Sequence, residues 1–98
     1  MILYDVEIFP NCFIFSMEFL ESGLKATWEI SEFRDDRQYL FEFFKWLHRT
    51  QTYMIGFNNI NFDYPVIHFI WNNPSATYQQ IYAKAMSIIE GEDRFVVS

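Results

Sequence analysis

The sequence has few of the residues that mark secreted or membrane-spanning chains. It holds one cysteine, Cys12, together with three glycines and three prolines in 98 residues. A single cysteine cannot close an internal disulfide, so nothing ties the chain to an oxidising compartment. Its apolar runs stay well short of the ~20 residues that span a bilayer, and the N-terminal MILYDVEIF lacks the basic start of a signal peptide. We therefore expect a cytoplasmic protein without a membrane segment.

Positive charge is also scarce. Seven lysines and arginines face thirteen aspartates and glutamates, which gives a formal net charge of −6. This balance excludes a protein that holds nucleic acid by neutralising phosphates with its own side chains alone. A role on nucleic acid would therefore require bound cations.

Hydrophobic residues are plentiful, at 51% of the chain, and 21% of the residues are aromatic. This composition excludes a disordered tail, and the length predicts one domain over residues 1–98. A domain of this size buries only about 60–65% of the surface of its unfolded chain. We therefore expect some aromatic side chains to stay exposed and the chain to self-associate, unless a partner or further chain covers them.

The residue pattern predicts an α/β fold with a mixed sheet. Three strands at 2–8, 11–19 and 25–30 follow one another through short turns, which indicates an antiparallel meander. Helical spacing then predicts a helix over 35–49, with Asp35 and Asp36 in its first turn and His48 and Arg49 in its last. The apolar run at 53–57 predicts a strand that is buried on both faces and parallel to the first.

Two further helices complete the predicted order. Pro65 suits the first turn of a helix that ends near Trp71. His68 lies on this helix between two apolar residues, and we expect its side chain to be packed in the protein and not to bind a ligand. Ser75 is the expected N-cap of the last helix and Gly91 lies just past its end. Residues 95–97 are one aromatic and two β-branched residues, Phe-Val-Val, which predicts the start of another strand.

Two acidic residues lie two positions apart on the first predicted strand. Asp5 and Glu7 therefore share one face, with Tyr4, Val6 and Ile8 on the other. Two adjacent carboxylates on a central strand repel each other unless a proton or a hard divalent cation lies between them. On an edge strand or on a sheet face that is open to solvent, however, such a pair of acidic residues is common and does not indicate a metal site.

A second polar cluster follows the 53–57 strand. Loops at the carboxyl ends of parallel strands hold the ligands of many α/β proteins, which would bring Asp63 towards Asp5. Asp63 can equally be an N-cap before the next helix. A capping role does not explain the three neighbouring asparagines, whose amides can contact phosphate, sugar or base without competing for a metal.

These two clusters together resemble a known family. D-V-E at 5–7 and G-F-N-N-I-N-F-D at 56–63 are similar to the first two motifs of DnaQ-like (DEDD) 3′–5′ exonuclease domains, as in the proofreading domains of phage-type DNA polymerases. The resemblance covers residues 1 to about 72 and implies a ribonuclease H-like fold. It also implies a two-metal site for Mg²⁺ or Mn²⁺, in which Asp5 bridges the ions, Glu7 binds the first and places the attacking water, and Asp63 holds the second.

The resemblance further implies a single-stranded 3′ end as substrate. Asn58 would contact the 3′-terminal nucleotide, while Phe9 and Phe62 are candidates to pack on splayed bases. For both phenylalanines, packing in the core is the competing interpretation. A preference between DNA and RNA does not follow from these residues.

The third motif of the family, Y-x-x-x-D or H-x-x-x-x-D, is absent. The late acids Glu90, Glu92 and Asp93 are the only stand-ins, and none falls on a clear helix beside a base. We therefore interpret the chain as the N-terminal part of an exonuclease domain, whose partner is the remainder of a polymerase.

Two alternatives remain open at this stage. One is a small phage-type protein, acting in the host cytoplasm, that uses an exonuclease-like scaffold to bind another protein through an aromatic and acidic surface. The Phe41, Phe43, Phe44 and Trp46 cluster, which is wide for one buried stripe, would contribute its outer members to that surface. The other is a mimic of DNA, for which −6 is a modest charge.

Overall fold

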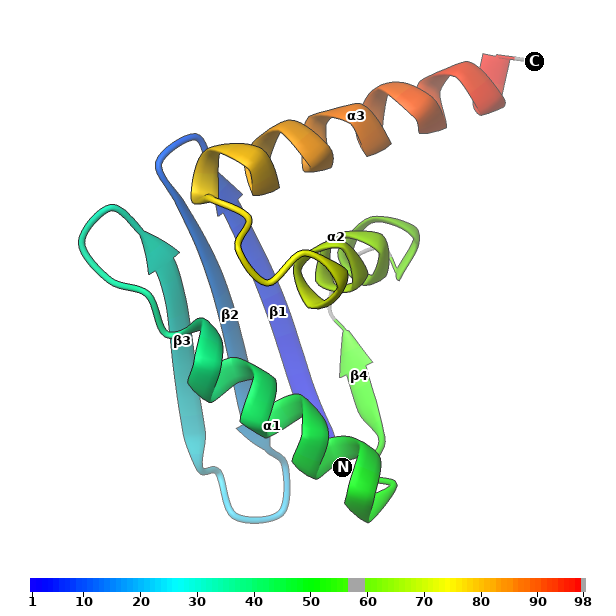
Figure 1. Cartoon of the computed structure of the whole chain (residues 1–98). Coiled ribbons are helices and arrows are strands. Elements are labelled where there is room, and N and C mark those ends of the chain that lie inside the picture. The colour runs from blue at the N-terminus through cyan, green and yellow to red at the C-terminus, as the bar shows by residue number, and fades with distance from the viewer. Residues whose placement is uncertain (57–59, 98) are drawn as a thin grey trace.

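Three antiparallel strands form most of the sheet. The computed structural model describes the backbone of residues 1–56 and 60–97, and the side chains of residues 1–56 and 64–90. Tight turns join β1 (Ile2–Phe9), β2 (Cys12–Phe19) and β3 (Lys25–Ser31) (Figure 1). β2 pairs antiparallel with both neighbours. The predicted meander is confirmed, and each strand differs from its predicted range by one residue.

The fourth strand lies beside β1 at the opposite edge from β3. β4 (Met54–Gly56) pairs parallel to β1, which gives the order β3-β2-β1-β4. The predicted parallel pairing is therefore confirmed. The predicted burial on both faces is wrong, because β4 is an edge strand, where Ile55 is 45% exposed and the preceding Tyr53 is 81% exposed. An apolar run alone does not distinguish an edge strand from a central one.

The first helix carries the chain back across the sheet to β4. α1 (Arg37–Thr50) begins after both aspartates, so the prediction that they lie in its first turn is wrong. Asp36 is the N-cap residue, but its carboxylate accepts a hydrogen bond from the backbone N–H of Glu29 at 3.0 Å instead of capping the helix. The last turn contains His48 and Arg49, as predicted, near the negative end of the helix dipole.

The second helix begins earlier than its proline suggests. α2 (Ile60–Asn72) has Pro65 at its sixth position, so the predicted start at Pro65 is wrong. Proline has a backbone φ that suits a helix, and here its missing N–H costs one bond, to the carbonyl of Asn61 in the first turn. Asp63 consequently lies within the helix and not in a loop before it.

The third helix also departs from the prediction at both ends. α3 (Tyr78–Val97) is capped by Thr77 and not by Ser75: Thr77 Oγ1 accepts from the Gln80 N–H at 3.1 Å, and Gln80 Oε1 accepts from the Thr77 N–H at 2.9 Å. The helix continues through Gly91 and includes residues 95–97, so the predicted end and the predicted last strand are wrong. One glycine costs a helix only about 1 kcal/mol relative to alanine. Within the described residues, no helix is both long and apolar enough to cross a membrane.

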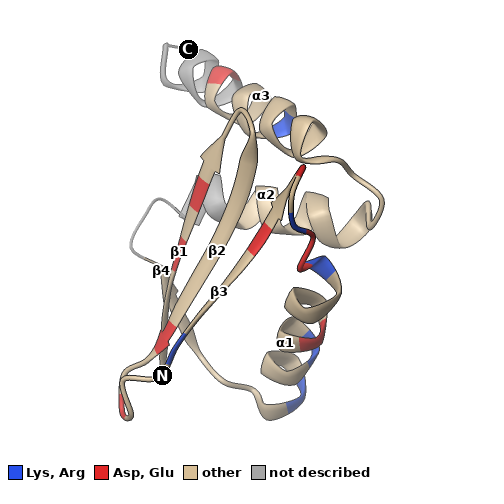
Figure 2. Cartoon of the chain, turned by 90° about the vertical axis from the view of Figure 1, so that its left-hand side faces the viewer, with Lys and Arg blue, Asp and Glu red and all other residues tan. Residues whose placement is uncertain are grey.

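The hydrophobic core lies between the sheet and the helices. Figure 2 shows α1 and α2 on one side of the sheet, while α3 crosses the end at which β1 finishes. Side chains alternate between the two faces of each strand, and those of the even-numbered residues of β1 and the odd-numbered residues of β2 point towards the helices. The buried core is formed by Ile2, Tyr4, Val6, Phe13, Phe15, Met17, Ile30, Leu40, Leu47, Val66, Ile70, Ala76, Ile81 and Ala85.

Aromatic rings extend this core along α1. Phe43 stacks on Trp28 with ring centroids 4.7 Å apart, and Phe41 meets Trp71 edge-on at 5.2 Å. The four aromatic residues of α1, whose outer members we expected to contribute to a contact surface, are all half-buried, so each keeps part of its ring exposed. The predicted exposure of other rings is confirmed, at Phe33, Tyr39, Tyr53 and Tyr64.

Candidate functional site

Two carboxylates project from the central strand on the side opposite the core. Along β1, Tyr4 and Val6 are buried against the helices, while Asp5 is half-buried and Glu7 is exposed. Alternation along a strand places Asp5 and Glu7 on one face. The predicted separation of the acidic and apolar faces of this strand is confirmed.

Strand pairing determines the neighbours of these carboxylates. Asp5 lies opposite Ser16 of β2, which lies opposite Thr27 of β3. The Ser16 and Thr27 hydroxyl oxygens are 3.4 Å apart. A row of one carboxylate and two hydroxyls therefore crosses three strands, and it lines a shallow hollow of about 290 Å³ together with Glu18 and Lys25.

The sheet face that carries Asp5 has an excess of negative charge. All four acidic residues of β1, β2 and β3 share it, against the single basic residue Lys25, whose Nζ is 3.6 Å from Glu18 Oε1. Burial raises the pKa of the Cys12 thiol, and the nearby charges of Glu29 and Glu7 raise it further. The negative electrostatic potential of this face favours a bound cation over an anion.

Asp63 follows the strand that borders Asp5. Tyr4 pairs with Gly56 at the end of β4, so the chain leaves β4 at the level of the residue before Asp5. α2 begins at Ile60, which puts Asp63 in its first turn. The side chain of Asp63 lies outside the described residues, as do Asn58 entirely and the side chain of Phe62.

The structure therefore describes two of the three candidate metal ligands. Within the side chains it describes, no group of three or more His, Cys, Asp or Glu residues gathers at one point. Asp5 and Glu7 share one strand face, and a third ligand would have to come from another element. Asp63 lies on α2, the helix that follows β4 in the chain, and α2 packs Val66 and Ile70 against the core side of the sheet, opposite the face of Asp5 and Glu7.

Two further sequence predictions about single side chains need correction. Phe9 ends β1 on the same face as Asp5 and is 43% exposed, so its expected packing in the core is wrong. His68 is exposed on α2, where its ring lies 4.4 Å from that of Tyr64, so it is not packed inside. Both side chains lie on the face of their element that points away from the core: Phe9 shares the odd-numbered face of β1 with Asp5, and His68 lies between the buried Val66 and Ile70 on α2.

The late acidic residues lie on a helix after all. Glu90, Glu92 and Asp93 are all within α3, which corrects the expectation that no clear helix carries them. Glu90 is exposed, and the side chains of the other two lie outside the described residues.

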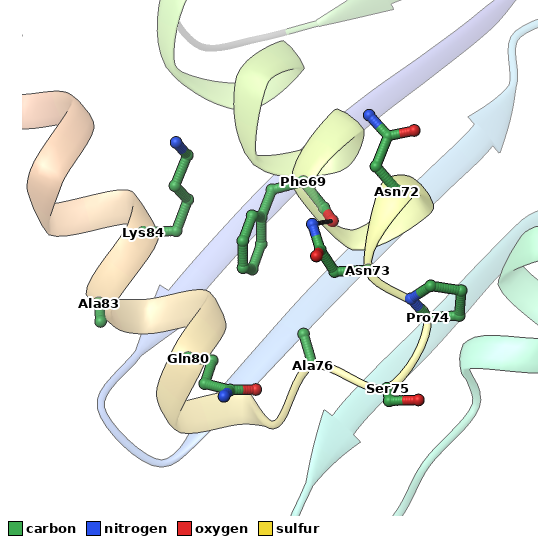
Figure 3. A pocket seen from close by; sticks show the side chains of 9 residues that line it. All are labelled: Phe69, Asn72, Asn73, Pro74, Ser75, Ala76, Gln80, Ala83 and Lys84. Carbon is green, nitrogen blue, oxygen red and sulfur yellow. Dashed lines mark hydrogen bonds between the residues drawn. The ribbon is translucent and has the colours of Figure 1, made fainter.

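A larger hollow lies at the corner between α2 and α3, and the sequence pattern did not predict it. It has a volume of about 750 Å³. Figure 3 shows Phe69 of α2 pointing into it, with Lys84 and Ala83 on the α3 side and Pro74 and Ala76 on the connecting segment. Lys84 Nζ lies 5.8 Å from the centre of the Phe69 ring, within the range of a cation–π interaction. The only sequence feature that indicates this corner is Asn72-Asn73-Pro74, which is expected to end the preceding helix.

Comparisons of the chain with protein-family models, with curated proteins and with solved structures gave no match.

Proposed function

We propose that this chain is a 3′–5′ exonuclease-type nuclease module with a ribonuclease H-like fold that acts on single-stranded 3′ ends. The observation that carries the proposal is the pair Asp5 and Glu7 on one face of the central strand, beside a parallel strand whose following helix contains Asp63. The strand order β3-β2-β1-β4 and the path of α1 between β3 and β4 agree with it. Such a module would act in the cytoplasm, or in the host cytoplasm if it is phage-encoded.

The carboxylates of this site fit a hard divalent cation. Asp5 and Glu7 offer oxygen ligands from one face, and Lys25, the basic residue nearest in the sheet, is engaged with Glu18. Asp5, Glu7 and Asp63 would hold Mg²⁺ or Mn²⁺. Bound metals would supply charge stabilisation for the attacking and leaving oxygens of phosphodiester hydrolysis. This requirement also accounts for a nuclease that is acidic overall.

The described side chains suit different roles in this reaction. Asp5 is half-buried in the centre of the sheet, which holds its carboxylate in a fixed place. Glu7 is exposed, so its carboxylate can bind and orient water. The half-exposed ring of Phe9 follows on the same face, where an unstacked base can pack on it. Asn58 is our proposed contact to the 3′-terminal nucleotide.

The test is degradation of a 5′-labelled single-stranded DNA in Mn²⁺. We expect stepwise shortening from the 3′ end by the wild-type chain and its loss in Asp5→Asn. Glu18→Gln is the matched control, since it removes one charge from the same sheet face at a residue that is not one of the proposed metal ligands. Equal degradation by wild type and Asp5→Asn would refute the proposal. The same assay on RNA determines which nucleic acid is preferred.

A second candidate function is a protein-binding scaffold without catalysis. The exposed aromatic side chains favour it, with Phe33 at 91% and Tyr39 at 70% exposure. The absence of the third exonuclease motif from the sequence also favours it. Its partner would be the rest of a polymerase chain or a separate protein. A folded chain that neither cleaves nucleic acid nor binds Mn²⁺ would support this function over the nuclease.

A further inference from the structure

The loop between β3 and α1 presents one aromatic side chain to solvent. Phe33 is 91% exposed, more than any other large hydrophobic residue that the structure describes. Glu32, the residue before it, is also exposed. Single exposed apolar residues are common on protein surfaces, so the conformation of the loop decides whether this one has significance.

Hydrogen bonds hold this loop in one shape. Ser31 Oγ accepts from the backbone N–H groups of Phe33 and Arg34, both at 3.2 Å, and donates to Glu29 Oε2 at 2.7 Å. The Asp36 carboxylate accepts from Arg34 Nε at 2.7 Å. The side chain of Phe33 is therefore kept away from the core by an ordered backbone, which lowers the entropy cost of inserting it into a partner.

The hollow between α2 and α3 combines an aromatic wall with a polar rim, which includes Asn72, Asn73, Ser75 and Gln80. Phe69 forms its aromatic wall, and Pro74, Ala76 and Ala83 supply small apolar surfaces (Figure 3). Among the described residues that line it, Lys84 is the one with a charge. At about 750 Å³, the hollow has room for a phenylalanine side chain and the residues that flank it.

We propose that two copies of this chain associate by inserting Phe33 of one copy into the hollow between α2 and α3 of the other. Phe33 then packs against the Phe69 ring, as aromatic pairs in interfaces do. The neighbouring Glu32 lies towards Lys84, so an acidic residue beside the inserted ring meets the cationic side of the hollow. This chain carries an acidic residue directly beside an exposed aromatic ring, which is the combination that the hollow fits, so the occupant we propose is a second copy.

Analytical ultracentrifugation across a concentration series tests this interface. It is run at about 0.15 M salt, where charges more than about 8 Å apart are largely screened and the net charge of −6 opposes association less. We expect Phe33→Ser to weaken self-association at least roughly tenfold, as the loss of a central aromatic anchor does. Tyr53→Ser is the matched control, because Tyr53 is 81% exposed on another loop, and it should associate as the wild type does.

A mixing experiment identifies the two halves of the interface. Phe33→Ser keeps the hollow, and Ala83→Trp fills the hollow but keeps Phe33, so each variant alone should stay monomeric while the mixture forms a complex. Lys84→Glu is a second hollow variant in case Ala83→Trp does not fold. Glu32→Lys, mixed with Lys84→Glu, should restore the association that each of these variants weakens alone. A wild-type chain that stays monomeric, or a Phe33→Ser variant that associates as the wild type does, would overturn the proposal.

Discussion

Asp36 joins the start of α1 to the last part of β3, and its removal should destabilise the fold measurably. Its side chain is 12% exposed and accepts two hydrogen bonds, from the Glu29 backbone N–H at 3.0 Å and from Arg34 Nε at 2.7 Å. The Asp36→Ala substitution leaves the Glu29 N–H without its acceptor. Because Arg34 is exposed, the bond to Glu29 carries most of the effect.

The size of this effect follows from the charge of the acceptor. A hydrogen bond to an ionised carboxylate contributes about 1.5–3 kcal/mol, so we expect Asp36→Ala to lower the free energy of unfolding by about 2 kcal/mol. In a domain of this length, that loss lowers the melting temperature by about 10 °C. Asp36→Asn keeps an acceptor oxygen and removes only the charge, so its melting temperature should lie between those of the wild type and Asp36→Ala. Thermal unfolding followed by circular dichroism measures all three proteins.

The effect should also depend on pH. Burial alone would raise the pKa of Asp36, but the hydrogen bonds from Glu29 and Arg34 outweigh it and hold the pKa below its usual value. The charged form therefore stabilises the fold fully above the unfolded pKa of about 3.9 and progressively less as pH falls through the lower folded pKa. The difference in stability between wild type and Asp36→Asn should shrink over that interval. A difference that stays constant from neutral pH to about pH 2, or an Asp36→Ala change below about 0.5 kcal/mol, would refute this reasoning.

Three further predictions concern packing and reactivity. An added Cβ at Gly56 would lie 2.9 Å from Tyr4 Cζ in the core. Gly56→Ala should therefore lower the free energy of unfolding by about 1–3 kcal/mol, measured by urea denaturation. Unchanged stability would contradict the packing described for β4. The largely buried Arg37 guanidinium donates to the Pro74 carbonyl oxygen, so Arg37→Met should speed proteolysis of the α2–α3 connection, and equal rates would argue against this contact. Cys12 should react with iodoacetamide more slowly than a model thiol at pH 8 and faster as pH rises, because burial and nearby carboxylates raise its pKa; a rate equal to that of the model thiol would count against it.

The parts of the fold that local patterns determine could be predicted from the sequence. Alternation along β1 and β2 separates core from surface residues, and the short turns require antiparallel pairing, so the meander follows directly. α1 is likewise set by its helical spacing and by the basic residues in its last turn. The shared face of Asp5 and Glu7 follows from the same two-residue period.

The remaining features depend on contacts between distant segments. β4 has an apolar sequence but lies at an edge, because no further described strand pairs with its outer side. Pro65 and Gly91 are frequent helix boundaries, yet both lie inside helices here. The exposed Phe33 depends on Ser31 and Asp36 acting together, which the sequence does not show. Whether Asp63 approaches Asp5 likewise depends on how α2 packs beside the sheet.

The most direct test of the central claim is whether Asp5 and Asp63 bind one divalent cation, since every version of the proposed nuclease requires it. The measurement is the shift in melting temperature on addition of Mn²⁺, reversed by a chelator. At 100 times the dissociation constant, binding stabilises the folded state by about 2.7 kcal/mol. We predict this shift for the wild type and for Glu18→Gln, and its loss in both Asp5→Asn and Asp63→Asn. An equal shift in all four proteins, or no shift in the wild type, would contradict a shared metal site.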